Sequence, residues 1–201
     1  PDIVANVASD GGLLAGSEAD VAVRSSDVRG AIQETYSRLD EQDQRAWQRL
    51  AMLPGSIERR VAARVAGTGW QGMRRLTDYA VVRHEGDRFE LHELVARFGR
   101  EMATAAIRSE AMEFAVSVWS ERLPQEIDPV TGKRTLLHPD DLEQALQAWR
   151  WVVDHGRWDV VTPMVLPLAR ESERGGRWRE FRISAAQAGT KARTAKGPWH
   201  K

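Results

Sequence analysis

The stretch that decides the fold is residues 69–106, GWQGMRRLTDYAVVRHEGDRFELHELVARFGREMATAA, and its centre is Leu91-His92-Glu93-Leu94. Apolar residues first recur at spacings of three and four, which predicts a helix; the period becomes two from Arg88 to Leu91, which predicts a strand. A Glu85-Gly86-Asp87 turn precedes this strand, and helical spacing returns afterwards. His92 is therefore expected where a β-strand ends and a helix begins. The helix predicted at the start of this stretch has an apolar face that comprises Trp70, Met73, Leu76 and Ala80.

Three more helices are expected before this stretch. The first should start near Asp27 with Ser25 or Ser26 as its N-cap, the second should follow Asp40, and Ser56 should cap the third. Helices in close succession followed by a hairpin are the order of a winged helix. We therefore expect a mainly α chain with a winged-helix domain at residues 27–108, whose wing is a small β-hairpin. We interpret residues 1–26 as a linker or the end of a preceding domain.

The remaining residues, 109–201, contain longer helical patterns. Asp140, with Glu143 three residues later, resembles a capping box that opens a helix. Two prolines interrupt the next helical pattern, so we expect Thr162 to cap that helix and the second proline to kink it.

The tripeptide Gly-Arg-Trp occurs at residues 156–158 and again at 176–178. A small residue at a turn, followed by an aromatic residue that starts the next helix, is typical of stacked helix pairs. We expect residues 109–201 to form an α-helical, repeat-like bundle with a disordered basic tail. A plain helical subdomain is the alternative.

The composition excludes several classes of protein. The 29 basic and 29 acidic residues cancel, so no global field draws the chain to nucleic acid or to an anionic membrane. Cysteine is absent, which excludes disulfides and thiolate metal sites and agrees with a cytoplasmic location. Apolar runs are too short to span a bilayer, so we expect no membrane partner. Because the chain begins at Pro1 in mid-pattern, we interpret it as a piece of a longer protein.

The sequence holds no recognisable catalytic site. A phosphate-binding loop needs Gly-x-x-x-x-Gly-Lys followed by Ser or Thr, and the nearest candidate, Gly132-Lys133, has Ile127 and Arg134 at the outer positions. The five histidines show no metal-ligand spacing. We therefore predict that the chain is not an enzyme and has no catalytic residue, metal or cofactor of its own.

Two stretches carry a resemblance to a known family. Residues 28–54, VRGAIQETYSRLDEQDQRAWQRLAMLP, together with residues 91–98, LHELVARF, resemble the winged-helix region of bacterial signal-transduction NTPases of the STAND type, which include the NB-ARC proteins. The matching motifs are Tyr36-Ser37-Arg38-Leu39, Leu53-Pro54-Gly55 and Leu91-His92-Glu93, where Glu replaces the more usual Asp. Residues 142–189 are similar to the onset of the tetratricopeptide-type repeats that follow this region in many members.

The resemblance implies a nucleotide-dependent switch. An NTPase core in the same polypeptide would hold ADP, and His92, followed by Glu93, would contact a phosphate and lock the closed state. Exchange for ATP would then release the winged helix and permit oligomerisation. The residues alone favour a plainer role for His92, as a local cap or packing residue, although a helix N-terminus with an imidazole donor suits an anion.

Two rival functions stay open. In a DNA-binding winged helix, Arg74, Arg75, Arg83 and Arg88 would contact the nucleic acid, but neighbouring acids cancel most of their field, so nucleic acid is possible and not favoured. In a protein-interaction scaffold, an exposed apolar groove would be lined by some of Trp149, Trp151, Trp158 and Trp178.

Overall fold

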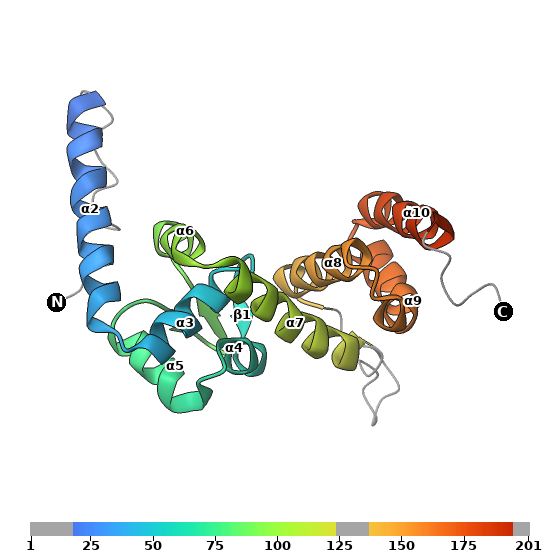
Figure 1. The fold of residues 1–201 in the computed structure, drawn as a ribbon, viewed down its shortest axis with the longest axis horizontal. Coiled ribbons are helices and arrows are strands. Elements are labelled where there is room, and N and C mark those ends of the chain that lie inside the picture. Colours follow the sequence, from blue (N-terminus) through green and yellow to red (C-terminus); the bar gives the residue numbers. More distant parts are fainter. Residues whose placement is uncertain (1–17, 124–136, 195–201) are drawn as a thin grey trace. The chain divides into compact units, whose positions relative to one another are not determined.

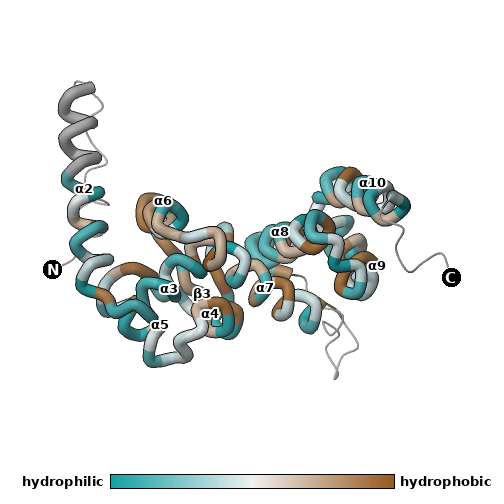
Figure 2. Tube along the Cα trace, viewed as in Figure 1, coloured by the Kyte–Doolittle hydropathy of each residue, from teal (hydrophilic) through white to brown (hydrophobic). Residues whose placement is uncertain are grey.

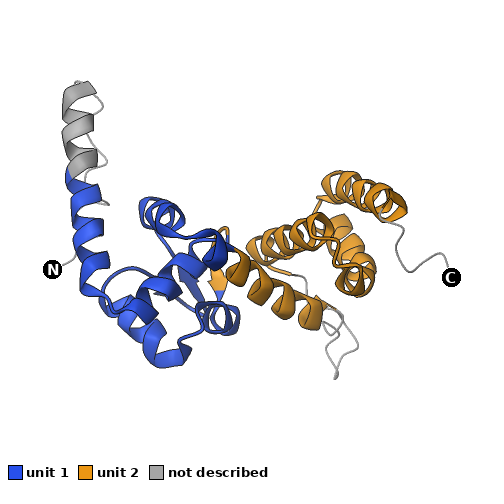
Figure 3. Ribbon diagram, viewed as in Figure 1, with its two compact units in different colours: residues 1–53, 58–108 blue, residues 54–57, 109–201 orange. Residues whose placement is uncertain are grey.

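The computed structural model describes the backbone of residues 18–123 and 137–194, and side chains from residue 27 onward (Figure 1). The chain divides into two compact units, of which one comprises residues 1–53 and 58–108 and the other residues 54–57 and 109–201 (Figure 3). The predicted basic tail beyond residue 194 lies outside the described residues. The expected mainly α class is confirmed, with one small β-sheet.

The first unit is made of helices and a three-stranded sheet. Its elements are α2 (Glu18–Arg38), α3 (Glu41–Leu50), β1 (Ile57–Glu58, whose first residue belongs to the other unit), α4 (Arg59–Ala66), α5 (Gly69–Asp78), β2 (Arg83–Glu85), β3 (Arg88–Glu90) and α6 (Glu93–Met102). The strand order in the sheet is β1-β3-β2. Strands β2 and β3 are antiparallel, with His84 opposite Phe89, and the two residues between them form the predicted turn. Gly86 has a positive φ of 57°, as a tight turn that begins with glycine requires.

Trp47 of α3 is at the centre of this unit's core. Its ring lies 5.5 Å from Tyr36 and 5.6 Å from Phe98, between centroids, and is 1% exposed. The indole Nε1–H donates to the carbonyl of Val95 at 3.0 Å, so this buried polar atom is satisfied. Gly99 lets α6 approach α3 closely, because a Cβ there would lie 2.7 Å from a side-chain carbon of α3's C-cap residue. The α3 core therefore positions α6.

Three local predictions in this unit are wrong. Helix α2 already begins at Glu18, so Ser25 and Ser26 lie inside it and part of the expected linker is helical; serine costs only about 0.5 kcal/mol in a helix interior. Ser56 does not cap α4, since β1 intervenes and Glu58 is the N-cap. Trp70 is 48% exposed and carries the Arg59 guanidinium 4.4 Å from its ring centroid, so it is not on the buried face of α5.

The second unit is helical. Its elements are α7 (Ala105–Arg122, whose first turn belongs to the first unit), α8 (Pro139–Asp154), α9 (Trp158–Arg174) and α10 (Trp178–Thr194). Buried Trp119, Trp149 and Phe181 supply the largest side chains of its core. Along the helices, short hydrophobic patches alternate with hydrophilic residues (Figure 2). Among the described residues, no helix combines the length and apolar character needed to cross a bilayer.

The expected helix starts in the second unit are wrong in two places. Asp140 is not the N-cap of α8; that position is His138, followed by Pro139 in the first turn. Helix α9 begins at Trp158 and not after Thr162, so both Pro163 and Pro167 lie within it. Each proline removes one backbone hydrogen bond, and burial of the opposite face of α9 offsets this loss.

Candidate functional site

The candidate site is the N-terminus of α6, immediately after the hairpin. Strand β3 ends at Glu90, and His92 is the N-cap residue with φ −57° and ψ 142°. Its ring is exposed, and Nδ1 accepts a hydrogen bond from the Leu94 N–H at 3.3 Å. In a neutral ring whose Nδ1 accepts, the proton is on Nε2. Among the described residues, Nε2 has no hydrogen-bond partner, so it is a donor available to a ligand.

Glu93 follows in the first turn of α6. Its exposed carboxylate accepts from Arg100 Nη2 at 3.0 Å, one side of an ion pair along the helix surface. Arg100 also donates through Nη1 to the Ala51 carbonyl at 3.2 Å. The Glu93 carboxylate is thus paired with the Arg100 guanidinium, two helical turns away. The start of α6 keeps the positive end of the helix dipole and one exposed imidazole donor, a combination suited to an anion.

The four arginines of the DNA hypothesis do not form one open surface. Arg75 donates to both carboxylate oxygens of Asp43, at 2.6 and 2.8 Å, and Asp43 is 2% exposed. This hydrogen bond raises the pKa of the Arg75 guanidinium above its usual value. Arg75 is therefore committed to neutralising a buried acid.

The other three arginines differ in environment. Arg83 pairs across the hairpin with Glu90 at 3.1 Å, and Arg88 is half-buried on β3. Arg74 has a side chain that is 85% exposed, with Asp78 4.0 Å away. Arg74 and Arg83 thus both have exposed side chains, 85% and 68%, but Arg83 is already paired with Glu90.

The three tryptophans proposed for partner binding come from three helices. Trp151 of α8 is half-buried and stacks on His155, with ring centroids 4.0 Å apart. Trp158 is half-buried at the start of α9. Trp178 of α10 is 45% exposed and lies 6.2 Å from Phe181. The three tryptophan rings thus lie near the ends of three different helices, each in a different environment.

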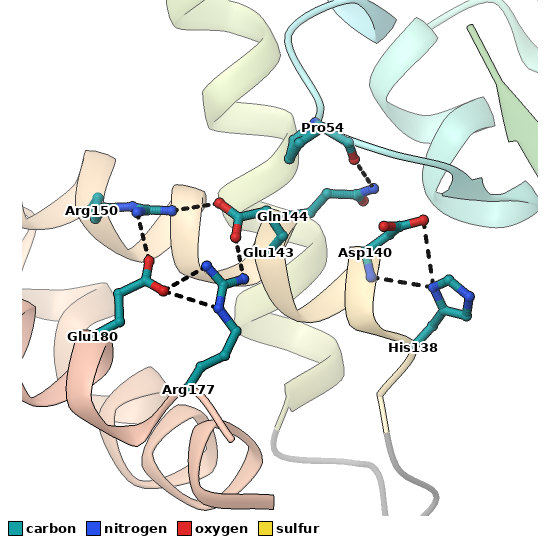
Figure 4. A network of polar contacts seen from close by, with 8 residues as sticks. All are labelled: Pro54, His138, Asp140, Glu143, Gln144, Arg150, Arg177 and Glu180. Carbon is teal, nitrogen blue, oxygen red and sulfur yellow. Dashed lines mark hydrogen bonds and ion pairs between the residues drawn. The ribbon is translucent and has the colours of Figure 1, made fainter. Parts of the chain in front are cut away.

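A polar network on α8 and α10 was not predicted from the sequence (Figure 4). Glu143 accepts from Arg150 at 2.8 Å and pairs with Arg177 of the turn before α10. Glu180 joins both arginines, at 3.0 Å from Arg150 and 2.6 Å from Arg177. The four side chains form a closed ring of alternating charge. The sequence did not indicate this ring, because charged residues at these positions are equally typical of a solvent-exposed helix face.

Helix α8 also forms hydrogen bonds with the segment at residues 54–57. Asp140 Oδ2 accepts from the Ser56 N–H at 3.0 Å and from its hydroxyl at 2.6 Å. Gln144, fully buried, donates through Nε2 to the Pro54 carbonyl at 2.9 Å (Figure 4) and to the Ser56 carbonyl, also at 2.9 Å. Gly55 has φ +68°, and a Cβ there would meet the Asp140 carboxylate at 2.5 Å. These contacts span more than 80 positions in sequence, so no local pattern could reveal them.

Comparison with known proteins does not identify a family for this chain, and its described side chains do not indicate a metal site. No protein-family model, curated protein or solved structure matches this chain. Within residues 27–123 and 137–194, the His, Asp and Glu side chains form no group of three or more able to hold a metal ion. The candidate site is therefore defined by the geometry at His92.

Proposed function

We propose that the chain is the regulatory winged-helix and helical-arm part of a nucleotide-dependent signalling switch of the STAND type. Its first unit would pack on an NTPase core of the same cytoplasmic polypeptide, and its second unit would be a tetratricopeptide-like arm that binds a protein. The order α3, β1, α4, α5, β2, β3 supports the winged helix, because it places two successive helices before a hairpin that also pairs with a third strand.

The observation that carries this proposal is the state of His92. Its Nδ1 satisfies the Leu94 N–H, which fixes the ring at the helix start and leaves Nε2–H as a donor in an exposed position. A phosphate of ADP would accept from that donor and from the positive end of α6. Loss of the phosphate contact would release α6, and with it the unit whose core α6 shares with Trp47.

The repeated turn at Gly156 and Gly176 supports an arm of stacked helices. Each glycine has a positive φ, 65° and 71°, and each is followed by an arginine and the tryptophan that opens the next helix. A stack of this kind exposes a long lateral surface, which suits protein binding.

Two measurements test the switch. The polypeptide upstream of Pro1 should contain Gly-x-x-x-x-Gly-Lys-Thr, roughly two hundred residues earlier. In that longer protein, His92→Ser replaces the capping Nδ1 by a hydroxyl that can also cap the helix but lacks the reach of an imidazole, whereas His92→Ala removes both the cap and the donor. We expect both variants to retain less ADP on purification, and only His92→Ala to lose about 1 kcal/mol of stability.

The chain offers a matched control in His138. This residue caps α8 with φ −58° and ψ 144°, and its Nδ1 accepts from the Asp140 N–H at 3.2 Å. His138→Ser makes the same replacement of a capping imidazole by a hydroxyl in the other unit and should leave ADP retention unchanged. Unchanged ADP content in His92→Ser, measured per mole of folded protein, would refute the phosphate contact.

DNA binding is the second candidate, and exposed Arg74 is the observation that favours it. It has less support because Arg75 is held by buried Asp43 and Arg83 is paired with Glu90. Salt-sensitive binding of random duplex DNA that disappears in Arg74→Ala would favour it over the switch.

A further inference from the structure

The segment at residues 54–57 belongs to the helical unit, although the chain on both sides of it belongs to the other unit. Residues up to 53 and from 58 to 108 are part of the first unit, and residues 54–57 are part of the second. The chain therefore leaves the first unit after α3 and returns to it before α4. Whatever holds this short segment also constrains the two chain ends that continue from it into the first unit.

Helix α8 holds the 54–57 segment through two of its side chains. The Asp140 carboxylate accepts from the N–H and the hydroxyl of Ser56, and the Gln144 amide donates to the carbonyls of Pro54 and Ser56 (Figure 4 shows the bond to Pro54). Because Asp140 and Gln144 are four residues apart, they lie on the same face of α8. One helix face thus engages both the donors and the acceptors of the segment.

The backbone of the segment fits α8 in one conformation. Gly55 has φ +68°, a value that residues with a Cβ rarely adopt. A Cβ at this position would lie 2.5 Å from both Cγ and Oδ1 of Asp140. The left-handed glycine therefore lets the segment approach the carboxylate closely enough for Ser56 to donate to it.

The burial of Gln144 is not explained by packing alone. Its side chain is 0% exposed, and Oε1 has no hydrogen-bond partner among the described residues. A buried amide oxygen without a partner costs stability, whereas a leucine of similar size would have no such cost. The favourable polar contribution of Gln144 is therefore its pair of hydrogen bonds to the 54–57 segment.

Both ends of the segment continue into hydrogen bonds within the first unit. Before it, the Ala51 carbonyl accepts from Arg100 Nη1 of α6 at 3.2 Å. After it, the Arg59 N–H donates to the Asp87 carbonyl in the hairpin turn at 3.0 Å. The hairpin precedes His92 in the chain, and α6 follows it. The segment is thus continuous with contacts to the two elements that flank His92.

We propose that Asp140 and Gln144 form a clamp on the 54–57 segment that couples the start of α8 to the start of α6. With the clamp closed, the segment is fixed in the conformation that its contacts on both sides require. With the clamp open, both chain ends gain freedom, and the first turn of α6 opens more often. Such local opening has its own free energy and does not require global unfolding. Only the use of this coupling, to carry a binding event on the arm to His92, rests on the proposed function.

The test is native-state amide hydrogen exchange of the complete chain, followed by NMR. One reporter is the Arg59 N–H, next to the segment. The other is the Ala96 N–H, which is 7% exposed and donates to the His92 carbonyl at 2.9 Å in the first turn of α6. Gln144→Leu removes both hydrogen bonds of the amide at similar size. We expect Arg59 to exchange about tenfold faster, because two buried carbonyls lose their donor, and Ala96 about threefold faster through the coupling.

Two further variants make the test specific. Ser184→Ala is the matched control, because it removes the acceptor of the buried Trp149 indole N–H, also on α8, without touching the clamp. The indole should exchange faster in this variant, while Ala96 should exchange as in the wild type. Ser56→Ala removes only the hydroxyl bond to Asp140 and keeps the fold if Gln144→Leu does not. It should speed the exchange of Arg59 and Ala96 in the same ratio as Gln144→Leu, to a smaller extent.

Three results would overturn the proposal. The first is faster exchange of Arg59 with unchanged exchange of Ala96, which would make the clamp a local contact without effect on α6. The second is unchanged exchange of both amides. The third is equal acceleration of Ala96 in Ser184→Ala and Gln144→Leu, which would indicate a general loss of stability. None of these measurements involves a nucleotide, so the clamp and the phosphate contact of His92 fail separately.

Discussion

Gly99→Ala tests the packing that positions α6. An ideal Cβ at Gly99 would lie 2.7 Å from the Ala51 Cβ and 2.9 Å from Trp47 Cδ1 and Nε1. Real Cβ atoms do not approach so closely, so α6 or the Trp47 ring must move. Movement of the ring also strains the hydrogen bond from Trp47 to the Val95 carbonyl.

The expected magnitude follows from two opposing terms. Replacing glycine in a helix interior by alanine gains about 1 kcal/mol of intrinsic helix stability. Overpacking of a close-packed core costs about 1–3 kcal/mol, and weakening the buried indole bond costs about 1 kcal/mol more. The free energy of unfolding of this unit should therefore fall by about 1–3 kcal/mol. Urea titration followed by the Trp47 indole N–H resonance, assigned with Trp47→Phe, reports on this unit alone.

Gly30→Ala is the matched control. Gly30 is in α2 of the same unit, and a Cβ there meets no atom within 4 Å. Only the helix-propensity term applies, so this variant should be more stable by about 0.5–1 kcal/mol. If Gly99→Ala were stabilised as Gly30→Ala is, α6 would not pack on α3 at Gly99, and the placement of His92 would fail with it.

Three further predictions concern ion pairs and turns. Arg75→Ala should lower the urea midpoint clearly, because it strands the buried Asp43 carboxylate, whereas Arg74→Ala should be nearly neutral; equal effects would contradict the described pair. Gly176→Ala, at φ +71°, should cost about 1–2 kcal/mol, while Gly189→Ala in open space within α10 should gain about 0.5–1 kcal/mol, both by thermal melting. The hydrogen bond from Arg157 lowers the pKa of Asp159 below its ordinary 3.8; its stabilisation is therefore present above that pH and lost as pH falls through the folded-state pKa. The urea midpoints of wild type and Asp159→Asn should differ at pH 6, and the difference should shrink as the pH falls below 3.8; a constant difference would contradict this pair.

Sequence periodicity predicted the elements that depend on local rules. The hairpin follows from alternation between Arg88 and Leu91 and from glycine at the turn, and both are satisfied within a few residues. The position of His92 between strand and helix follows from the same change of period. The second helix begins after Asp40 as predicted, because that side chain accepts from the Asp43 N–H at 2.8 Å.

The missed features depend on distant contacts. Strand β1 has two residues, too few to show any period, and forms only because the hairpin strand β3 lies beside it. Arg75 was equally indistinguishable from Arg74 in sequence, since both are arginines in the middle of one helix. Burial of Asp43, 32 positions away, decides which of them is committed. The start of α9 was predicted too late because Pro163 was taken to lie in the first turn of the helix. In the structure, packing of the opposite helix face stabilises α9 on both sides of this proline.

A histidine cap alone does not make an anion site, and the two histidine caps of this chain show why. At α8, the His138 Nδ1 lies 3.7 Å from Asp140 Oδ2, so a carboxylate already stands at the positive end of the helix. That carboxylate is fixed there by Ser56. At α6, the first-turn carboxylate of Glu93 is drawn towards Arg100. Helix α8 thus supplies its own anion, whereas α6 keeps its positive end and the Nε2–H of His92 exposed, as the proposed phosphate contact requires. Because of this difference, we expect His92→Ser to retain less ADP and His138→Ser to retain as much as the wild type.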